Sequence, residues 1–183
     1  MNGVRGLLLT VLVCGGCAAG HPSEPQSPRA DSPAELLSRG EAAAAAGDTT
    51  RAEQYFAAAL QVGGEDPRIV QRLLAACVSD RRYPAAIQYA ERYLRHHPDD
   101  PEIGFAAASL QLATGNSPRA RELLETLTAR VPRWPEPHFA LASVLREQGE
   151  APVDAELHDL EYLKLAPNGP LAEAARSRLR RTQ

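Results

Sequence analysis

Apolar and polar positions between residues 33 and 169 follow the 3.6-residue spacing of amphipathic helices, and the whole pattern returns every 34 residues. Glycine marks one phase of this period, and Arg81 takes the same phase in the second unit. A sustained period of this length indicates stacked helical hairpins. The residues that recur at this spacing are the glycines 47, 115 and 149, the alanines 52, 86 and 120, and the prolines 98 and 132.

Each unit is predicted to contain a first helix, a turn, a second helix and a proline that ends it. In the second unit the two helices are expected over Pro67–Ser79 and Pro84–His96. Glycine in the turn permits a left-handed residue, and the recurring alanine lets the two helices of a unit approach closely. The last unit is one residue longer than the others. The four units are 33–66, 67–100, 101–134 and 135–169.

Residues 170–183 are predicted to form a capping helix, giving nine helices in all. Leu171, Ala175 and Leu179 share one face, which would cover the apolar end of the last unit. Removing this helix is expected to expose Leu163 and Leu165. Four arginines at positions 176, 178, 180 and 181 suit the negative end of the helix dipole, and a lipid- or nucleic-acid-binding patch is the alternative.

Four segments resemble the tetratricopeptide repeat (TPR): GDTTRAEQYFAAAL, RRYPAAIQYAERYLRHHP, GNSPRARELLETLTARVP and GEAPVDAELHDLEYLKLAP. The resemblance covers residues 33–169 and implies an all-α, right-handed solenoid of four helix-turn-helix repeats. The first unit departs from it by ending in Gly63-Gly64. A second departure is that the large aromatic residue expected early in each unit is replaced. The four units have Leu36, Val70, Gly104 and His138 at this position. The matching residues are Gly47, Phe56, Ala59, Tyr83, Ala86, Tyr93, Pro98, Gly115, Ala120 and Pro132.

The first residues are typical of an export signal. Arg5 precedes the apolar run Leu7–Val13, which is too short to span a bilayer. The run ends in CGGC, which resembles the bacterial lipoprotein signal, and this resemblance implies that Cys17 is acylated after removal of residues 1–16. Cys14 is the alternative acceptor, but it follows the bulky Val13. Ala18 as the second mature residue then implies an outer-membrane protein that faces the periplasm.

Residues 17–32 are expected to form a disordered tether, because prolines, serines and charges there offer no apolar face to bury. The mature protein would then be anchored to the membrane by lipid and would not span it.

Composition narrows the function. Lys164 is the only lysine among 20 basic residues, and the formal net charge of -3 argues against a nucleic-acid partner. The odd number of cysteines implies no disulfide framework. Cys77 is expected on the inner face of its helix as a small, unreactive hydrophobe.

No set of residues predicts catalysis, a cofactor or a metal. His96 and His97 are adjacent, so their side chains are expected to point in different directions on a solvated turn. His138 and His158 are expected at different heights in the fourth unit. Glu122 and Glu125 alternate with arginines, as on a solvated helix face.

The TPR resemblance implies a partner-binding groove formed by the first helices. Phe105 and Phe139 occupy equivalent positions, and either they anchor a peptide or they pack between repeats. A clamp for a C-terminal carboxylate is disfavoured, because Leu37 and Glu41 occupy the positions of its lysine and asparagine. The predicted groove residues are Leu37, Glu41, Arg68, Gln71, Arg72, Ala75, Phe105, Ser109, Leu112, Phe139, Ser143 and Arg146.

The sequence therefore predicts a lipid-anchored TPR scaffold, not an enzyme, that binds a protein or peptide partner in the bacterial envelope. A pilotin-like lipoprotein that assists pilus or secretin assembly is the alternative. An enzyme or a cell-wall-glycan-binding protein is disfavoured, because the necessary polar constellation is missing.

Overall fold

The computed structural model describes residues 31–149 and 151–181. The predicted signal peptide, Cys17 and most of the tether lie outside these ranges. Within them the chain forms nine α-helices and no strand. None of these helices has the length and apolar content needed to cross a membrane. The helices are α1 (Pro33–Ala45), α2 (Thr49–Gly63), α3 (Pro67–Ser79), α4 (Tyr83–His96), α5 (Pro101–Ala113), α6 (Ser117–Arg130), α7 (Pro135–Gln148), α8 (Pro152–Leu165) and α9 (Ala172–Arg181).

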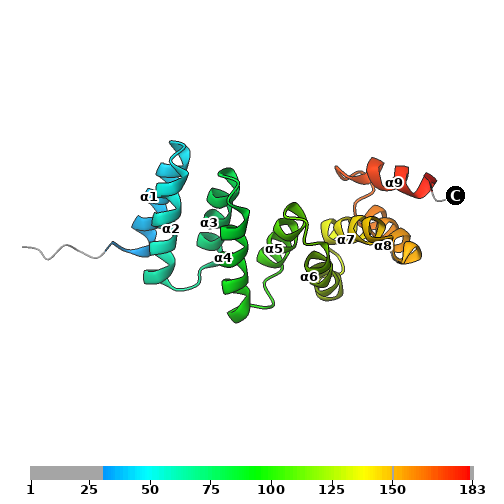
Figure 1. The fold of residues 1–183 in the computed structure, drawn as a ribbon, viewed down its shortest axis with the longest axis horizontal. Helices are drawn as coiled ribbons and strands as arrows, with labels where there is room; N and C mark the ends of the chain where they lie inside the picture. The colour runs from blue at the N-terminus through cyan, green and yellow to red at the C-terminus, as the bar shows by residue number, and fades with distance from the viewer. Residues whose placement is uncertain (1–30, 150, 182–183) are drawn as a thin grey trace, which may run out of the picture. The chain divides into compact units, whose positions relative to one another are not determined.

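The first eight helices form four hairpins that follow one another in chain order (Figure 1). Each first helix packs on its own second helix, and each second helix packs on the first helix of the next hairpin. Helix α9 packs on α8. The prediction of an all-α repeat solenoid with four hairpins and a capping helix is confirmed.

The first helices share one kind of start. Pro33, Pro67, Pro101 and Pro135 each open a first helix and stand 34 residues apart. Proline suits this position because its missing N–H has no partner within the helix. The side chain of Asp100 accepts hydrogen bonds from the backbone N–H groups of residues 102 and 103, both at 3.0 Å. Such caps satisfy the free donors of the first turn.

The turn inside each hairpin repeats a left-handed backbone. The φ angles are +78° at Gly47, +57° at Arg81, +80° at Gly115 and +68° at Gly149. The predicted role of this phase is confirmed, and Arg81 adopts the conformation that glycine provides elsewhere. Helix α4 starts at Tyr83, one residue earlier than expected.

Small residues bring the helices together. The recurring alanines are fully buried, at 0% exposure. Gly40 has a related role, because a Cβ atom there would lie 2.4 Å from the ring of Phe56. Apolar clusters then fill the space between successive hairpins. The buried alanines are Ala52, Ala86, Ala120 and Ala155.

Helix α9 closes the last hairpin. Ala172 and Ala175 are buried against Tyr162, with Phe139 and Leu163 packed on the same cluster. The backbone N–H of residue 171 donates to the Tyr162 hydroxyl at 3.0 Å. The cap therefore covers Leu163, as expected, and an aromatic pair that the sequence did not single out. Leu165 is not part of this cluster.

Candidate partner-binding surface

At its amino-terminal end, the first-helix surface carries charges that are paired with one another. Arg72 Nε lies 3.1 Å from the Glu41 carboxylate, which links α1 to α3. Gln71 donates to the carboxylate of Glu102 on α5. Arg68 pairs with the preceding Asp66 at 2.8 Å. Ala75 is exposed on the same helix, and Leu37 is half-buried in the first apolar cluster.

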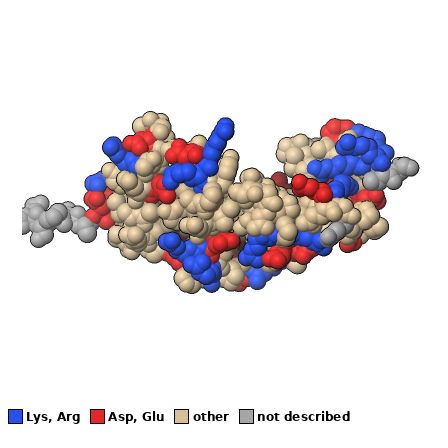
Figure 2. Space-filling view, viewed as in Figure 1, with Lys and Arg blue, Asp and Glu red and all other residues tan. Residues whose placement is uncertain are grey.

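The middle of this surface, on α5, has no charged residue after the first turn. The ring of Phe105 is half-buried, and its centroid lies 5.0 Å from that of Trp134. Ser109 is exposed, and its hydroxyl donates to the Phe105 carbonyl at 2.9 Å. Leu112 is half-buried. Figure 2 shows uncharged atoms on the floor of a hollow where Figure 1 places α5.

The carboxy-terminal end of this surface, on α7, is covered by the cap. The Arg178 guanidinium carbon lies 4.0 Å from the centroid of the Phe139 ring, a cation–π contact. The same ring also packs against Tyr162, with a centroid distance of 5.4 Å. Ser143 donates its hydroxyl to the Phe139 carbonyl at 2.8 Å. Phe105 and Phe139 thus both pack between neighbouring elements, and their role as anchors stays a prediction.

Asp159 on α8 holds the cap and α7 together. Its side chain is fully buried and pairs with Arg146 of α7, and it lies 3.5 Å from Arg178 of α9. Burial raises the pKa of the Asp159 carboxyl, while the two arginines oppose this shift. Burial also lowers the pKa of Arg178. The sequence analysis did not predict this cluster. A signal was present, because Asp159 falls at helical spacing on the same face of α8 as the buried Ala155 and Tyr162.

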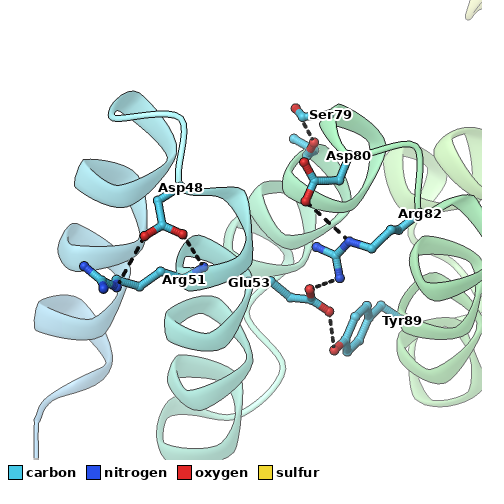
Figure 3. Close-up of polar contacts among 8 residues, drawn as sticks. Asp48, Arg51, Glu53, Ser79, Asp80, Arg82 and Tyr89 are labelled. Atoms are coloured by element: carbon cyan, nitrogen blue, oxygen red, sulfur yellow. Dashed lines mark hydrogen bonds and ion pairs between the residues drawn. The ribbon is translucent and has the colours of Figure 1, made fainter.

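A second polar cluster joins the second helices α2 and α4 (Figure 3). The Glu53 carboxylate pairs with Arg82 and accepts a hydrogen bond from the Tyr89 hydroxyl at 3.0 Å. Cys77 is fully buried, and burial, with Glu53 as a further cause, raises the pKa of its thiol to about 11. The expectation that this cysteine lies in the core is confirmed, and its lack of reactivity stays a prediction that the raised pKa favours.

Two expectations for the histidines were wrong. His96 and His97 do not diverge, because Nδ1 of the first and Nε2 of the second both reach the Glu65 carboxylate, at 2.8 and 2.7 Å. Linking through different ring nitrogens lets adjacent residues converge on one carboxylate.

The second error concerns the fourth unit. The side chains of His138 on α7 and His158 on α8 meet, with 3.0 Å between their Nδ1 atoms, although their positions in the two helices were expected to keep them apart. Burial, followed by the neighbouring His138, lowers the pKa of His158. Among residues 31–149 and 151–181, no group of three or more His, Cys, Asp or Glu side chains is placed to hold a metal ion.

The alternating charged residues of α6 form ion pairs along the helix. Arg119 contacts Glu122 at 2.6 Å, and Arg121 contacts Glu125 at 2.7 Å. The prediction of a charged, solvated helix face is confirmed there.

Two family models, both described as tetratricopeptide repeat, match this chain at residues 37–101 and 78–145. Together they span residues 37–145, more than half of the chain. The protein is therefore a tetratricopeptide-repeat protein, of a class that generally serves as a scaffold for protein–protein interaction. Comparison with curated protein sequences found no match.

Several solved structures share the fold. A tetratricopeptide repeat protein from Parabacteroides merdae is 18% identical, with a TM-score of 0.73 over 80% of this chain and 58% of that one. YrrB, described as a TPR protein with an unusual peptide-binding site, is 16% identical, with a TM-score of 0.66 over 79% and 74%. The pilF protein of Pseudomonas aeruginosa is 15% identical, with a TM-score of 0.63 over 73% and 61%. At these identities the likeness shows the fold alone.

Proposed function

We propose that this protein is a lipid-anchored scaffold that holds a protein partner at the periplasmic face of the outer membrane in a bacterial envelope. The repeat fold supports partner binding, and the lipoprotein-like sequence that ends at Cys17 supports the anchor and the location. A scaffold of this kind needs no catalytic residue and no cofactor. It acts by keeping a bound protein near the membrane surface.

The observation that carries partner binding is the uncharged part of the first-helix surface. Ser109 is exposed on α5, with Phe105 and Leu112 half-buried beside it. The charged residues of α1 and α3 on one side of this strip are mostly paired with one another, and α9 covers α7 on the other. Desolvating such a strip is less costly than desolvating charges, so it suits a partner segment with apolar side chains.

A substitution at Ser109 tests this surface without removing core packing. Ser109→Arg places a long charged side chain on the strip, and we expect at least a tenfold loss of partner binding, or about 1.4 kcal/mol. The measurement is capture of partners from a native envelope, followed by titration of the captured protein. Gln88→Arg is the matched control, because Gln88 is exposed on the second helix α4.

Equal binding by wild type and Ser109→Arg, with loss in Gln88→Arg, would place the partner on the second helices. Circular dichroism of both variants shows whether the helices are retained.

The anchor has its own test. Cys17→Ala should abolish incorporation of labelled palmitate and release the protein from the membrane fraction, whereas Cys14→Ala should do neither. The physical reason is that several acyl chains on one cysteine bind membranes durably, since each buried methylene contributes about 0.8 kcal/mol. Labelling that survives Cys17→Ala and disappears in Cys14→Ala would move the cleavage site.

A pilotin-like role in pilus or secretin assembly is the second candidate. It is favoured by the combination of a lipoprotein-like signal with a fold similar to that of the pilF protein. In cells that lack this protein, secretin multimers should then be missing from the outer-membrane fraction. Normal multimers in these cells would leave the general scaffold role as the proposal.

A further inference from the structure

One position of the repeat lacks the side chain that its equivalents carry. Val70 and His138 are buried at this phase of the second and fourth units, with 2% and 6% exposure. The third unit has Gly104 there. Gly104 lines a surface pocket of about 640 Å³ that lies between α4, α5 and α6. We call it the Gly104 pocket.

The equivalent space one repeat earlier is smaller. It lies between α2 and α4 above Val70 and measures about 260 Å³. Each residue that lines it has a counterpart 34 positions later in the lining of the Gly104 pocket. The two sites are therefore the same feature of the repeat, enlarged where large side chains are replaced by smaller ones. Three pairs of lining residues show this change: Val70 and Gly104, Tyr89 and Leu123, and Tyr93 and Leu127.

The interior of the Gly104 pocket is apolar, and most charges at its rim have partners. Arg119 pairs with Glu122 at 2.6 Å. Arg130 pairs with Asp99 and also donates to a backbone carbonyl. The interior is lined by Leu94, Pro101, Gly104, Ala107, Leu123 and Leu127.

Among the arginines at this rim, Arg95 is the exception, and the remaining carboxylates, Glu91 and Asp100, accept hydrogen bonds from Gln111 and from the Tyr93 hydroxyl. Arg95 is exposed on α4 and makes no ion pair with any residue in the described part of the chain. An unpaired guanidinium at the edge of an apolar pocket favours a ligand that carries a negative charge beside an apolar group.

We propose that the Gly104 pocket binds a protein segment in which a large apolar side chain is followed by an acidic residue. The apolar side chain fills the pocket beside Gly104, and the carboxylate pairs with Arg95. Truncation of such an anchor side chain typically weakens binding strongly. The pocket is formed by second helices and by a different face of α5 from the one that carries Ser109. It is therefore a second binding site, separate from the first-helix surface.

The test uses the full chain with Cys14→Ser and Cys17→Ser, which prevents acylation. Fluorescent pentapeptides of sequence Gly-Ser-Phe-Glu-Ser and Gly-Ser-Ala-Glu-Ser are titrated, and binding is followed by anisotropy. We expect the phenylalanine peptide to bind at least about tenfold more tightly than the alanine peptide. Gly104→Val should remove this preference, because it restores the side chain that the second unit carries.

Gly104→Ala is the milder variant in case valine disturbs the helix. Its Cβ atom would lie 3.3 Å from Leu127 Cδ2, so it narrows the floor and should weaken binding by a smaller factor. Helicity and melting of both variants are measured by circular dichroism.

The charge is tested separately. Arg95→Glu should weaken binding of the peptide that contains glutamate and strengthen binding of a Gly-Ser-Phe-Lys-Ser peptide. Arg39→Glu makes the same change of charge on α1, away from the pocket, and should alter neither.

Three results would overturn the proposal. The first is unchanged peptide binding in folded Gly104→Val. The second is loss of binding in Ser109→Arg with full binding in Gly104→Val, which would place the peptide on the first-helix surface. The third is binding of decanoate without binding of either peptide, which would make the ligand a free fatty acid.

Discussion

The turn between α3 and α4 depends on the conformation of a single residue. Arg81 has φ of +57°, in the left-handed region where a side chain crowds the following carbonyl. The other three hairpins place glycine at this phase, so the second unit is the exception. The turn still forms because the helices on either side of it are packed against their neighbours.

Replacing this arginine should stabilise the protein. We expect Arg81→Gly to raise the free energy of unfolding by about 0.5–1 kcal/mol, because relief of strain exceeds the added entropy of the unfolded chain. Urea denaturation measures the change. Gly115→Arg is the reverse substitution at the equivalent position and should lower stability, so equal stability of wild type and both variants would contradict this account.

At the scale of helices, α9 is attached to α7 and α8 by buried charges as well as by apolar packing. Asp159 contributes a buried carboxylate, and Arg146 and Arg178 bring two guanidinium groups to it. Tyr162 adds apolar contact and accepts a hydrogen bond from the chain entering α9. The cap is therefore held by charge and by apolar burial together.

These two contributions are separable by mutation. Asp159→Asn should lower the free energy of unfolding by about 3 kcal/mol, because it leaves Arg146 and Arg178 without a carboxylate. Deleting residues 170–183 should cost more and cause association, since it also uncovers Tyr162 and Phe139. Denaturant unfolding and sedimentation report the two effects. An unchanged midpoint for Asp159→Asn would show that apolar contact alone holds the cap.

At the scale of the whole repeat array, the Glu65 carboxylate links two turns between hairpins that are one repeat apart. Glu65 lies between the first two hairpins, and His96 and His97 lie at the end of the second. Hydrogen bonds from these histidines hold the pKa of Glu65 below its ordinary value of 4.5. A lowered carboxyl pKa means that the contribution to stability is present above pH 4.5 and is lost as the pH falls through the folded-state pKa.

Glu65→Gln tests this link through its pH dependence. The variant should melt at a lower temperature than wild type at pH 6, and the difference should shrink as the pH falls below 4.5. Thermal melts followed by circular dichroism at several pH values give the comparison. Glu136→Gln removes a carboxylate from the first turn of α7 and serves as a control. A difference that does not change with pH would contradict the role of the ionised carboxylate.

The elements were predictable because their signals are local. Helix starts, left-handed turns and buried alanines each depend on the backbone within a few residues, and the 34-residue period repeats the same signal four times. The contacts of the candidate site were less predictable. Phe105 and Phe139 were identified by their phase. The residues that pack on them lie far along the chain: Trp134 is the last residue of the unit that contains Phe105, and Arg178 belongs to the cap.

The sequence by itself determined the repeat architecture and the place of the cap, because periodicity and turn chemistry act over short distances along the chain. Tertiary structure alone decided which side chains meet across repeats. It joined His96 and His97 to Glu65, buried Asp159 between two arginines, and opened the pocket above Gly104. Such contacts depend on the reach of side chains across packed helices, where a single change of size or rotamer selects the partner.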